Sequence, residues 1–425
     1  MSRQGATDTQ SKSGVNATYT LLALAGGAGL GATANYAWGH TRVLTAVIHY
    51  GTEPIGQIWL RALIMTVVPL VFASISLGLL ELRALGKVGK TGRRLLALIL
   101  LTQALAALVG FAVSGILRPG ARLSSDLRDR LVAAYPPRDH GSEGGAQTEG
   151  MSIATIVKIV PINPIGAAAQ GDMLGLVFFS ILFGAALAGA PATRTAALVE
   201  ALRGVSYLMT LLVDMVMRTA PVGVFALVFT VAARLGMEII GQVGLYLVTG
   251  ICALAIFVAL VQFPLLRFFG GREPIGFMLS AREALSTAFS TGSSNATLPT
   301  TLRVCEERLG LPTSVCDFVV PVGVTMCKNG TALFDAVVVA FLAQAWAVPL
   351  GIGATLTATI MIVVIGLGTA GVPGATFPLL ILVLHSVGVP AEGIGIIVGV
   401  DLILDLCRTA VNVAGDIVVA ACVAR

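Results

Sequence analysis

Charged residues are scarce in this chain of 425 residues: Asp, Glu, Lys and Arg make up 12% of it, against 56% hydrophobic residues. Soluble domains usually carry about 25% charged residues. A globular protein of this size could not cover its surface with so few charges. The composition therefore excludes a soluble enzyme, a nucleic-acid-binding protein and a disordered chain, and the mean hydropathy of +0.91 indicates a membrane protein with several spans.

Paired cysteines and clustered histidines are missing as well. The six cysteines are scattered without a Cys-x-x-Cys pair, and the four histidines form no motif with metal-ligand spacing. We therefore expect free thiols in apolar surroundings, no cofactor and no His-based metal site. The net charge of +5 is small and does not suggest a nucleic-acid partner. Neither a nucleophile–base pair nor a metal cluster supports a membrane enzyme.

Glycine, by contrast, is abundant, with 49 residues. Such a content is typical of close helix contacts and broken helices in lipid. Residues 1–16 form a polar N-terminal tail without the apolar core of a signal peptide. Several of the apolar segments that follow exceed 25 residues, which predicts tilt or a kink. Spans are predicted at about 18–38, 54–82, 92–117, 152–189, 205–235 and 244–268.

Basic residues in the short connections predict the orientation. The densest basic cluster lies at 83–94, and Arg267, Arg272 and Arg282 flank the end of the sixth apolar segment. Because Lys and Arg concentrate in cytoplasmic loops, both regions are expected in the cytoplasm. The N- and C-termini are then cytoplasmic, and the polar loop 119–150 is external. We expect a multi-pass protein of the cytoplasmic (inner) membrane.

Small, polar and turn-forming residues interrupt two apolar stretches after residue 270, at 286–299 and at 366–376. Non-helical backbone at membrane depth is tolerated only where protein or a water-filled cavity satisfies its polar groups. Two such interruptions favour a transporter binding site built from inverted repeats. The alternative is a pair of ordinary loops between four short spans. The arms of about 12–15 residues are short for full spans, which favours re-entrant hairpins.

The last apolar segment contains a polar stripe. Its members at 405, 409, 412 and 416 are spaced by four, three and four residues and therefore lie on one helix face. Ionisable groups are costly in lipid, so the stripe must face protein or water. Arg408 can hold a carboxylate through two donors, and Asp405 can accept from an ammonium. The pair suits an acidic amino acid, and a buried structural salt-bridge network is the alternative. The stripe consists of Asp401, Asp405, Arg408, Thr409, Asn412 and Asp416.

The sequence of this stripe resembles the last-helix signature of the dicarboxylate/amino acid:cation symporters, the glutamate transporter family. Residues 293–299 (SSNATLP) resemble the tip of that family's first hairpin, and residues 368–374 (GTAGVPG) resemble the tip of its second. The similarity extends through residues 220–226 (APVGVFA) and 69–72 (PLVF). It therefore covers most of the chain and rests on several independent motifs.

The resemblance implies an all-α membrane protein with eight transmembrane helices and two re-entrant helical hairpins. This is the glutamate-transporter-like elevator fold, assembled as a homotrimer. Residues 17–90 would hold scaffold spans 1 and 2, residues 91–118 transport-domain span 3, and residues 151–240 scaffold spans 4 and 5. Residues 241–425 would form the transport-domain core, which comprises span 6, hairpin 1 at about 274–303, span 7, hairpin 2 at about 350–390 and span 8.

The resemblance also implies roles for single residues. Arg408 would bind the side-chain carboxylate of the substrate and Asp405 its amino group, while Thr409 and Asn412 would add polar contacts. The residues that would close the site are Thr331, Ser293, Ser294 and Val372, with Gly371, Pro373 and Gly374 at the gate.

The seventh span departs from the family pattern. Where the family has Asn-Met-Asp-Gly-Thr, which helps to hold sodium ions, residues 327–331 read CKNGT. Cys327 replaces an amide oxygen with a soft, weak acceptor, and Asn329 replaces a carboxylate with a neutral amide. In the third span, Thr102 is retained, but Ile99 and Gln103 stand where the family has an aromatic residue and Ser. We therefore expect degraded sodium sites without a bound metal ion.

Lys328 falls inside this altered motif and is one of only five lysines in the chain. We hypothesise that its ammonium acts as a tethered cation in place of sodium, with Asp416 as its carboxylate partner. One alternative is that Lys328 merely forms a salt bridge with Asp416 in an inactive homologue. Another is that Lys328 or a nearby carboxylate takes up and releases a proton during transport.

The sequence thus predicts a secondary-active, sodium-independent carrier for an acidic amino acid such as aspartate or glutamate. Proton coupling is the favoured drive, and uncoupled exchange or uniport is the next alternative. A sodium-coupled amino-acid or dicarboxylate symporter with fewer sodium sites is the alternative within the family. An anion channel is the alternative from another class. The expected partners are the acidic substrate, protons, membrane lipid and two further copies of the chain.

Overall fold

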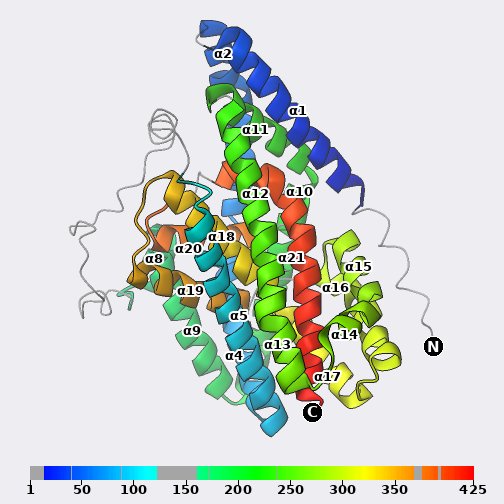
Figure 1. Ribbon diagram of the computed structural model, residues 1–425. Coiled ribbons are helices and arrows are strands. Elements are labelled where there is room, and N and C mark those ends of the chain that lie inside the picture. Colours follow the sequence, from blue (N-terminus) through cyan, green and yellow to red (C-terminus); the bar gives the residue numbers. More distant parts are fainter. Residues whose placement is uncertain are drawn as a thin grey trace.

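A computed structural model of the chain describes residues 14–39, 41–87, 89–121, 160–170, 172–235, 237–367, 376–390 and 394–425. These residues are largely helical and contain no β-strand (Figure 1). The helices, with π-helical turns marked η, are α1 (Gly14–Trp38), α2 (Arg42–Val47), η1 (Ile48–Thr52), α3 (Glu53–Ile64), α4 (Val67–Lys87), α5 (Lys90–Leu117), α8 (Pro164–Gln170), α9 (Met173–Gly189), α10 (Ala192–Arg218), α11 (Ala220–Leu235), α12 (Met237–Phe257), η2 (Val258–Gln262), α13 (Phe263–Leu265), η3 (Leu266–Gly270), α14 (Pro274–Ser280), α15 (Arg282–Thr291), α16 (Ser294–Arg303), η4 (Val304–Arg308), α17 (Thr313–Met326), α18 (Asn329–Ala345), α19 (Ile352–Gly366), α20 (Thr376–Ser386) and α21 (Ile394–Val423).

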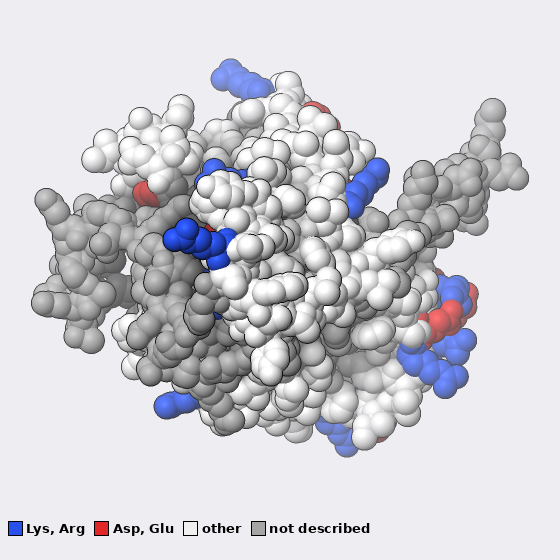
Figure 2. Space-filling model, turned by 90° about the horizontal axis from the view of Figure 1, so that it is seen from above, with Lys and Arg blue, Asp and Glu red and all other residues white. Residues whose placement is uncertain are grey.

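Several helices are long and apolar enough to cross a membrane, which confirms the class inferred from composition. Charged side chains are sparse on the face shown in Figure 2, where white surface separates a few small groups of them. Within the described ranges there are six such stretches, Arg42–Leu80, Lys90–Leu117, Ala192–Arg218, Val243–Gly270, Thr313–Ala345 and Leu404–Val423.

The predicted spans 18–38, 92–117 and 244–268 correspond to α1, α5 and the continuous helix from α12 to η3. Helix α1 already begins at Gly14, inside the predicted tail, whose residues 1–13 lie outside the described residues. The predicted span 54–82 contains a turn at Met65–Thr66, between α3 and α4. Of the predicted external loop, residues 122–150 lie outside the described ranges.

Two other predicted spans are also divided between helices. The segment 205–235 belongs to two helices, α10 and α11, which meet at Thr219. Pro221 has no N–H to donate to the carbonyl of Met217, so the α10 ladder cannot continue through it. In the segment 152–189, the described part contains the short helix α8 and then α9. Asp172 starts α9 by accepting a hydrogen bond from the backbone N–H of Gly175 at 3.0 Å.

Most helix contacts fall within two groups, which are joined because α1 and α11 also pack on α21. In the first, α1 packs on α11, α3 on α11, and α4 on both α9 and α10. In the second, α21 packs on α12, α15, α17 and α18, while α5 packs on α12, α18 and α19. Figure 1 shows α21 (red) beside α12 (green), with α15 and α16 on one side. The buried polar residues of the last helix therefore lie within the second group.

Glycine brings α1 and α11 together. Gly27 and Gly31 are four residues apart and face α11, and a Cβ atom on Gly31 would lie 2.7 Å from the carbonyl oxygen of Phe229. Above this contact, Asn35 donates through Nδ2 to the carbonyl of Ala233 at 2.7 Å. Small residues at such spacing are a common means of close helix approach in membranes.

Helices α15 and α16 form a helical hairpin with its turn at Gly292 and Ser293. Gly292 adopts φ +61°, a left-handed conformation that favours glycine, and Ser293 caps α16 by accepting a hydrogen bond from the N–H of Ala296 at 3.3 Å. Both residues lie within the interrupted stretch predicted at 286–299. In the second interrupted stretch, α19 and α20 are described, but residues 368–375 between them lie outside the described residues.

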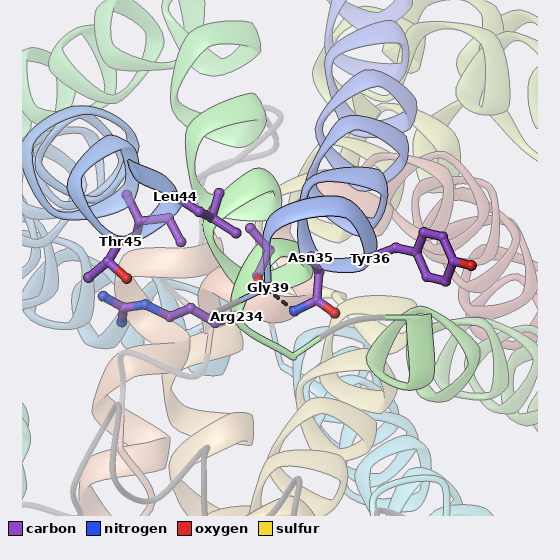
Figure 3. Close-up of a pocket in the computed structure, with 8 residues that line it drawn as sticks. Asn35, Tyr36, Gly39, Leu44, Thr45 and Arg234 are labelled. Atoms are coloured by element: carbon purple, nitrogen blue, oxygen red, sulfur yellow. Dashed lines mark hydrogen bonds between the residues drawn. The ribbon is translucent and has the colours of Figure 1, made fainter. Parts of the chain in front are cut away.

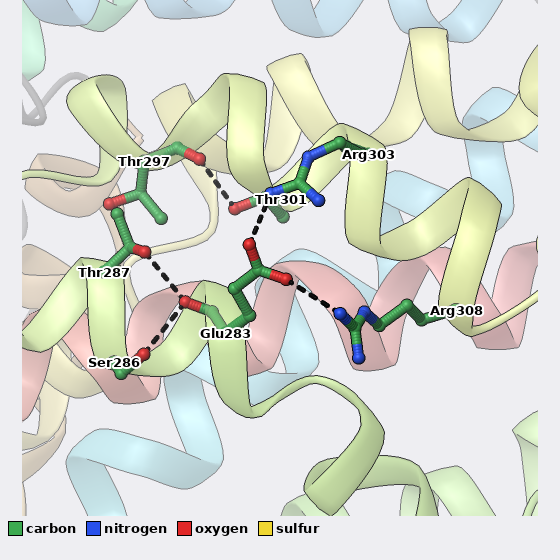
Figure 4. Close-up of polar contacts among 7 residues, drawn as sticks. All are labelled: Glu283, Ser286, Thr287, Thr297, Thr301, Arg303 and Arg308. Carbon is green, nitrogen blue, oxygen red and sulfur yellow. Dashed lines mark hydrogen bonds and ion pairs between the residues drawn. The ribbon is translucent and has the colours of Figure 1, made fainter.

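Ion pairs join the two arms of the α15–α16 hairpin at its open end. Glu283 on α15 pairs with Arg303 at the end of α16 and with Arg308 at 3.4 Å. Figure 4 shows the Glu283 carboxylate between the two guanidinium groups. The hydrogen bond from Arg303 lowers the pKa of the Glu283 carboxyl below its ordinary value.

The close α1–α11 contact predicts that Gly31→Ala destabilises the protein. The added methyl group would lie 2.7 Å from Phe229 O and 2.8 Å from Ala232 Cβ, so the two helices must separate. Overpacking of this kind costs about 1–3 kcal/mol, which should appear as a lower midpoint of thermal unfolding. Gly29→Ala is the matched control, because its methyl group meets no atom within 4 Å. Equal midpoints for the two variants would contradict the contact.

The Glu283 ion pairs predict a pH-dependent hairpin. Because folding lowers the pKa of Glu283, its stabilising effect is present above the unfolded-state pKa and is lost as pH falls through the folded-state pKa. After correction for the intrinsic rate, amide hydrogen exchange in α15 and α16 should therefore accelerate as the pH falls below 4.5, the ordinary pKa of a glutamate carboxyl. Glu283→Gln should remove this dependence, and Glu307→Gln, which changes a nearby exposed carboxylate, should retain it. An unchanged pH profile in Glu283→Gln would count against the role of the ion pairs.

Candidate functional site

The polar stripe predicted on the last helix is one buried face of α21. Its spacing follows the helical repeat, and the surrounding residues are apolar, so the folded chain turns all six polar side chains inward. Each of them is at most 7% exposed: Asp401, Asp405, Arg408, Thr409, Asn412 and Asp416.

Arg408 is held from two sides by carboxylates. Its Nε donates to Asp405 Oδ1 at 2.8 Å, and its Nη2 lies 2.8 Å from the same oxygen. Its Nη1 lies 3.6 Å from Asp401 Oδ1. The guanidinium carbon also lies 4.5 Å from the ring centroid of Phe334, a cation–π contact. Arg408 is therefore charge-compensated, yet Nη1 makes no hydrogen bond within the described residues and remains a free donor.

Asn412 joins α21 to the beginning of α18. Its Oδ1 accepts hydrogen bonds from the backbone N–H of Gly330 at 2.8 Å and of Thr331 at 3.3 Å. Its Nδ2 donates to Thr331 Oγ1 at 3.1 Å. The first N–H groups of a helix have no partner inside the helix, and Asn412 supplies one from a neighbour. Two residues predicted to contact substrate thus bond to each other.

The altered motif at residues 327–331 lies at a break between two helices. Helix α17 ends at Met326 and α18 begins at Asn329, while Cys327 (φ −94°, ψ 81°) and Lys328 (φ −103°, ψ 52°) leave the helical conformation. The last carbonyl groups of α17 therefore lack the usual intrahelical donors. Both residues at the break are buried, with Cys327 at 0% and Lys328 at 2% exposure.

Two side chains donate hydrogen bonds to these carbonyl groups. Lys328 Nζ donates to the carbonyl of Val324 at 2.5 Å, and Gln103 Nε2 donates to that of Met326 at 3.0 Å. The expected ion pair with Asp416 is not formed, because the carbonyl of Val324 takes the ammonium instead. Lys328 and Asp416 remain close enough to interact electrostatically.

Asp416 lies in a buried region with several polar atoms that lack partners. The side chain is 0% exposed, and neither carboxylate oxygen accepts a hydrogen bond from a described residue. The amide oxygen and nitrogen of Asn329 and the Oε1 atom of Gln262 are unpaired in the same sense. Unsatisfied buried polar atoms are costly, so this region is suited to a small polar or charged guest such as water, a proton or a cation.

Two further polar residues near Arg408 are absent from the predicted set. Asp335, one turn after Thr331 on α18, is 3% exposed and its Oδ1 has no described partner. Tyr246 on α12 is fully buried against the rings of Phe334 and Phe341, and its hydroxyl is likewise unpaired. The sequence does point to Asp335, because an ionisable residue inside an apolar span is costly in lipid and is therefore a candidate for a functional site. The same argument applies to the polar residues of α21. Nothing in the sequence distinguishes Tyr246 in this way, because tyrosine is uncharged.

Of the site residues predicted in the two hairpins, the structure describes those of the first hairpin. Ser293 and Ser294 begin α16, whose hairpin packs against α21 through α15 and α16. Ser294 is 3% exposed, and Thr297 Oγ1 donates to the carbonyl of Ser293 at 2.8 Å. The predicted contact Val372 and the predicted gate residues Gly371, Pro373 and Gly374 lie outside the described residues.

A buried arginine flanked by carboxylates, beside a broken helix and a helical hairpin in a multi-span protein, is the kind of arrangement that binds or moves a polar solute through a membrane protein. The chain belongs to the sodium:dicarboxylate symporter family, whose model matches residues 17–425. It is therefore a membrane transporter and not an enzyme.

Three relatives illustrate the range of the family. The proton/glutamate-aspartate symporter of Escherichia coli (strain K12) is 33% identical over 86% of this chain and 82% of its own length. The proton/sodium-glutamate symport protein of Bacillus subtilis (strain 168) is 31% identical over 88% and 87%. The C4-dicarboxylate transport protein of Azorhizobium caulinodans is 29% identical over 88% and 82%.

The bridge between α21 and α18 predicts unequal effects of two substitutions on stability. Asn412→Ala leaves the N–H groups of Gly330 and Thr331 and the hydroxyl of Thr331 without their partner, and each such group costs about 1–3 kcal/mol when buried. Thr331→Val leaves the backbone bonds intact and removes only the acceptor of Asn412 Nδ2. The thermal-unfolding midpoint should therefore fall further for Asn412→Ala. A larger effect of Thr331→Val would contradict this bonding scheme.

Proposed function

We propose that this protein carries acidic amino acids, aspartate or glutamate, across the cytoplasmic membrane together with protons and without sodium. The observation that carries sodium independence is the hydrogen bond from Lys328 Nζ to the carbonyl of Val324 at the break in the seventh span. The substrate class follows from Arg408 and from the printed names of the relatives.

The geometry around Arg408 supports an amino acid with a second carboxylate. The free Nη1 donor, together with the other guanidinium donors, suits the side-chain carboxylate of the substrate. Asp405 then accepts from the substrate ammonium, as expected from the sequence. Thr409 would add a polar contact to the substrate, and Ser293 and Ser294 would help to close the site.

Sodium independence is supported by what occupies the carbonyl groups of α17. Backbone carbonyl oxygens are ligands for hard cations. Here Lys328 and Gln103 donate to two of them, from Val324 and Met326. The ammonium of Lys328 also repels a second cation at short range. The lysine is thus a tethered cation, with the Val324 carbonyl as its direct partner and Asp416 as a nearby countercharge.

Proton coupling is supported by carboxylates that are buried and incompletely paired. Asp335, Asp401 and Asp416 each have at least one oxygen without a hydrogen-bond partner among the described residues. Because an ionised carboxylate is expensive to bury without a partner, these groups are candidates to carry a proton while the site is closed to water. Asp335 and Asp401 flank Arg408, where the substrate would compete for the arginine.

The two groups of packed helices support the proposed elevator mechanism. The group containing α1, α4, α10 and α11 would form the scaffold of a homotrimer, and the group around α21 would be the transport domain that moves against it. The second hairpin, between α19 and α20, would act as the gate. Eight spans, two re-entrant hairpins and cytoplasmic termini complete the proposal.

A second candidate function is symport of an amino acid or a C4-dicarboxylate with sodium, using fewer sodium sites. It is favoured by the family description and by the relative named as a C4-dicarboxylate transport protein. A plain dicarboxylate would leave Asp405 without an ammonium to bind, so we rank this function second.

The proposal predicts how ion gradients drive uptake. In proteoliposomes at clamped membrane potential, an inward proton gradient without sodium should concentrate labelled aspartate. With an inward sodium gradient and equal pH on both sides, labelled aspartate should reach the same concentration inside and outside the vesicles but should not accumulate. Aspartate uptake that requires sodium would contradict the tethered-cation role of Lys328. Succinate that competes as well as aspartate would favour the second candidate.

The same assay tests Lys328 directly. Lys328→Met should abolish uptake at every sodium concentration, because Cys327 and Asn329 still cannot rebuild a sodium site. Lys90→Met, which removes an exposed lysine at the start of α5, is the matched control and should transport normally. Arg408→Gln, which should not bind substrate, gives the background level of aspartate uptake. Undiminished proton-driven uptake by a well-folded Lys328→Met variant would overturn the proposed role.

A further inference from the structure

A pocket of about 650 Å³ opens between the ends of α1 and α11 and the segment α2–η1, within the usual size range of ligand pockets. In Figure 3, the side chain of Arg234 extends beside Thr45, and Asn35 lies on the other side of the pocket. The ring of Tyr36 points away from the pocket. Leu44, Ile48 and Ala233 supply an apolar floor.

Arg234 supplies a partly available positive charge to this pocket. Its Nη2 donates to Glu53 Oε2 at 2.7 Å, and the Arg234 side chain is 29% exposed. A guanidinium has five N–H donors in a planar fork, so the single bond to Glu53 leaves donors for a ligand. Oxyanions are the partners that this fork matches best.

Aromatic and aliphatic side chains surround the pocket on the outside of the protein. Tyr36 is 95% exposed, Trp38 60% and Tyr50 81%. Tyr and Trp are enriched where a membrane meets water, which places the pocket at the level of lipid headgroups. Val43 and Val47, four residues apart on one helical face, are also exposed and lie next to the face of Leu44 and Ile48. They suit contact with acyl chains.

We propose that this pocket binds a phospholipid, with the headgroup phosphate on Arg234 and the acyl chains along α2. A guanidinium at headgroup depth attracts phosphate. A free phosphate ion would gain nothing from the exposed apolar residues beside the pocket, so the lipid is the better fit. Bound there, the lipid connects α1, α2 and α11 at one end of the first helix group, away from Arg408 and the carrier site.

The test uses phosphatidylglycerol as the probe and native mass spectrometry of the protein released from detergent. Arg234→Gln should lower the retained lipid about tenfold or more. Glu53→Gln breaks the same ion pair but keeps the guanidinium, so it should retain at least as much lipid as the original chain. Equal lipid retention by Arg234→Gln, or equal losses in both variants, would overturn the proposal.

A second pair of variants tests the pocket without changing charge. Thr45→Trp fills the space beside Arg234, whereas Ala46→Trp places the same ring on the neighbouring residue outside the lining. Only Thr45→Trp should lose lipid. Glycerophosphoglycerol, the headgroup without acyl chains, should bind much more weakly than the lipid. Equal binding of this soluble headgroup, or a change of oligomeric mass in Thr45→Trp, would overturn the proposal in favour of a free phosphoester or a second copy of the chain.

Discussion

The cost of keeping charge away from water governs the interior of this protein. Charged side chains inside a membrane-spanning bundle must find compensation within the protein, because lipid offers none. Arg408 has Asp405 and Asp401, and Lys328 has the carbonyl of Val324. A helix that broke without such donors would leave carbonyl groups unpaired. The break between α17 and α18 and the buried face of α21 are therefore two parts of one arrangement.

This dependence explains which parts of the site could be predicted from the sequence. The spacing of polar residues on α21 required one buried face, because turning any ionisable member toward lipid would be expensive. The interruption predicted at 286–299 followed from small and polar residues in an apolar stretch, and the turn at Gly292 and Ser293 lies within it. These features are local, and both are present in the folded chain.

Other features depend on distances that a sequence does not contain. Asp416 was the natural partner for Lys328 by charge, but the flexible lysine side chain reaches a carbonyl four residues back on its own segment. Gln103 looked like a lost sodium ligand, yet its amide donates to the neighbouring helix at the break. Hydropathy alone predicted one span at 205–235, whereas Pro221 divides this segment into two helices. In each case a specific hydrogen bond, made or missing, decided the outcome.

The number of buried charges has an electrical consequence. Among the residues that the structure describes, four carboxylates are buried together with two cations, Lys328 and Arg408; the carboxylates are Asp335, Asp401, Asp405 and Asp416. With every group ionised, the empty site would carry two uncompensated negative charges. Each charge that crosses the full membrane potential is worth about 2.3 kcal/mol per 100 mV. Two bound protons would bring the empty site to neutrality, so the effect of voltage on transport would depend on the number of protons bound.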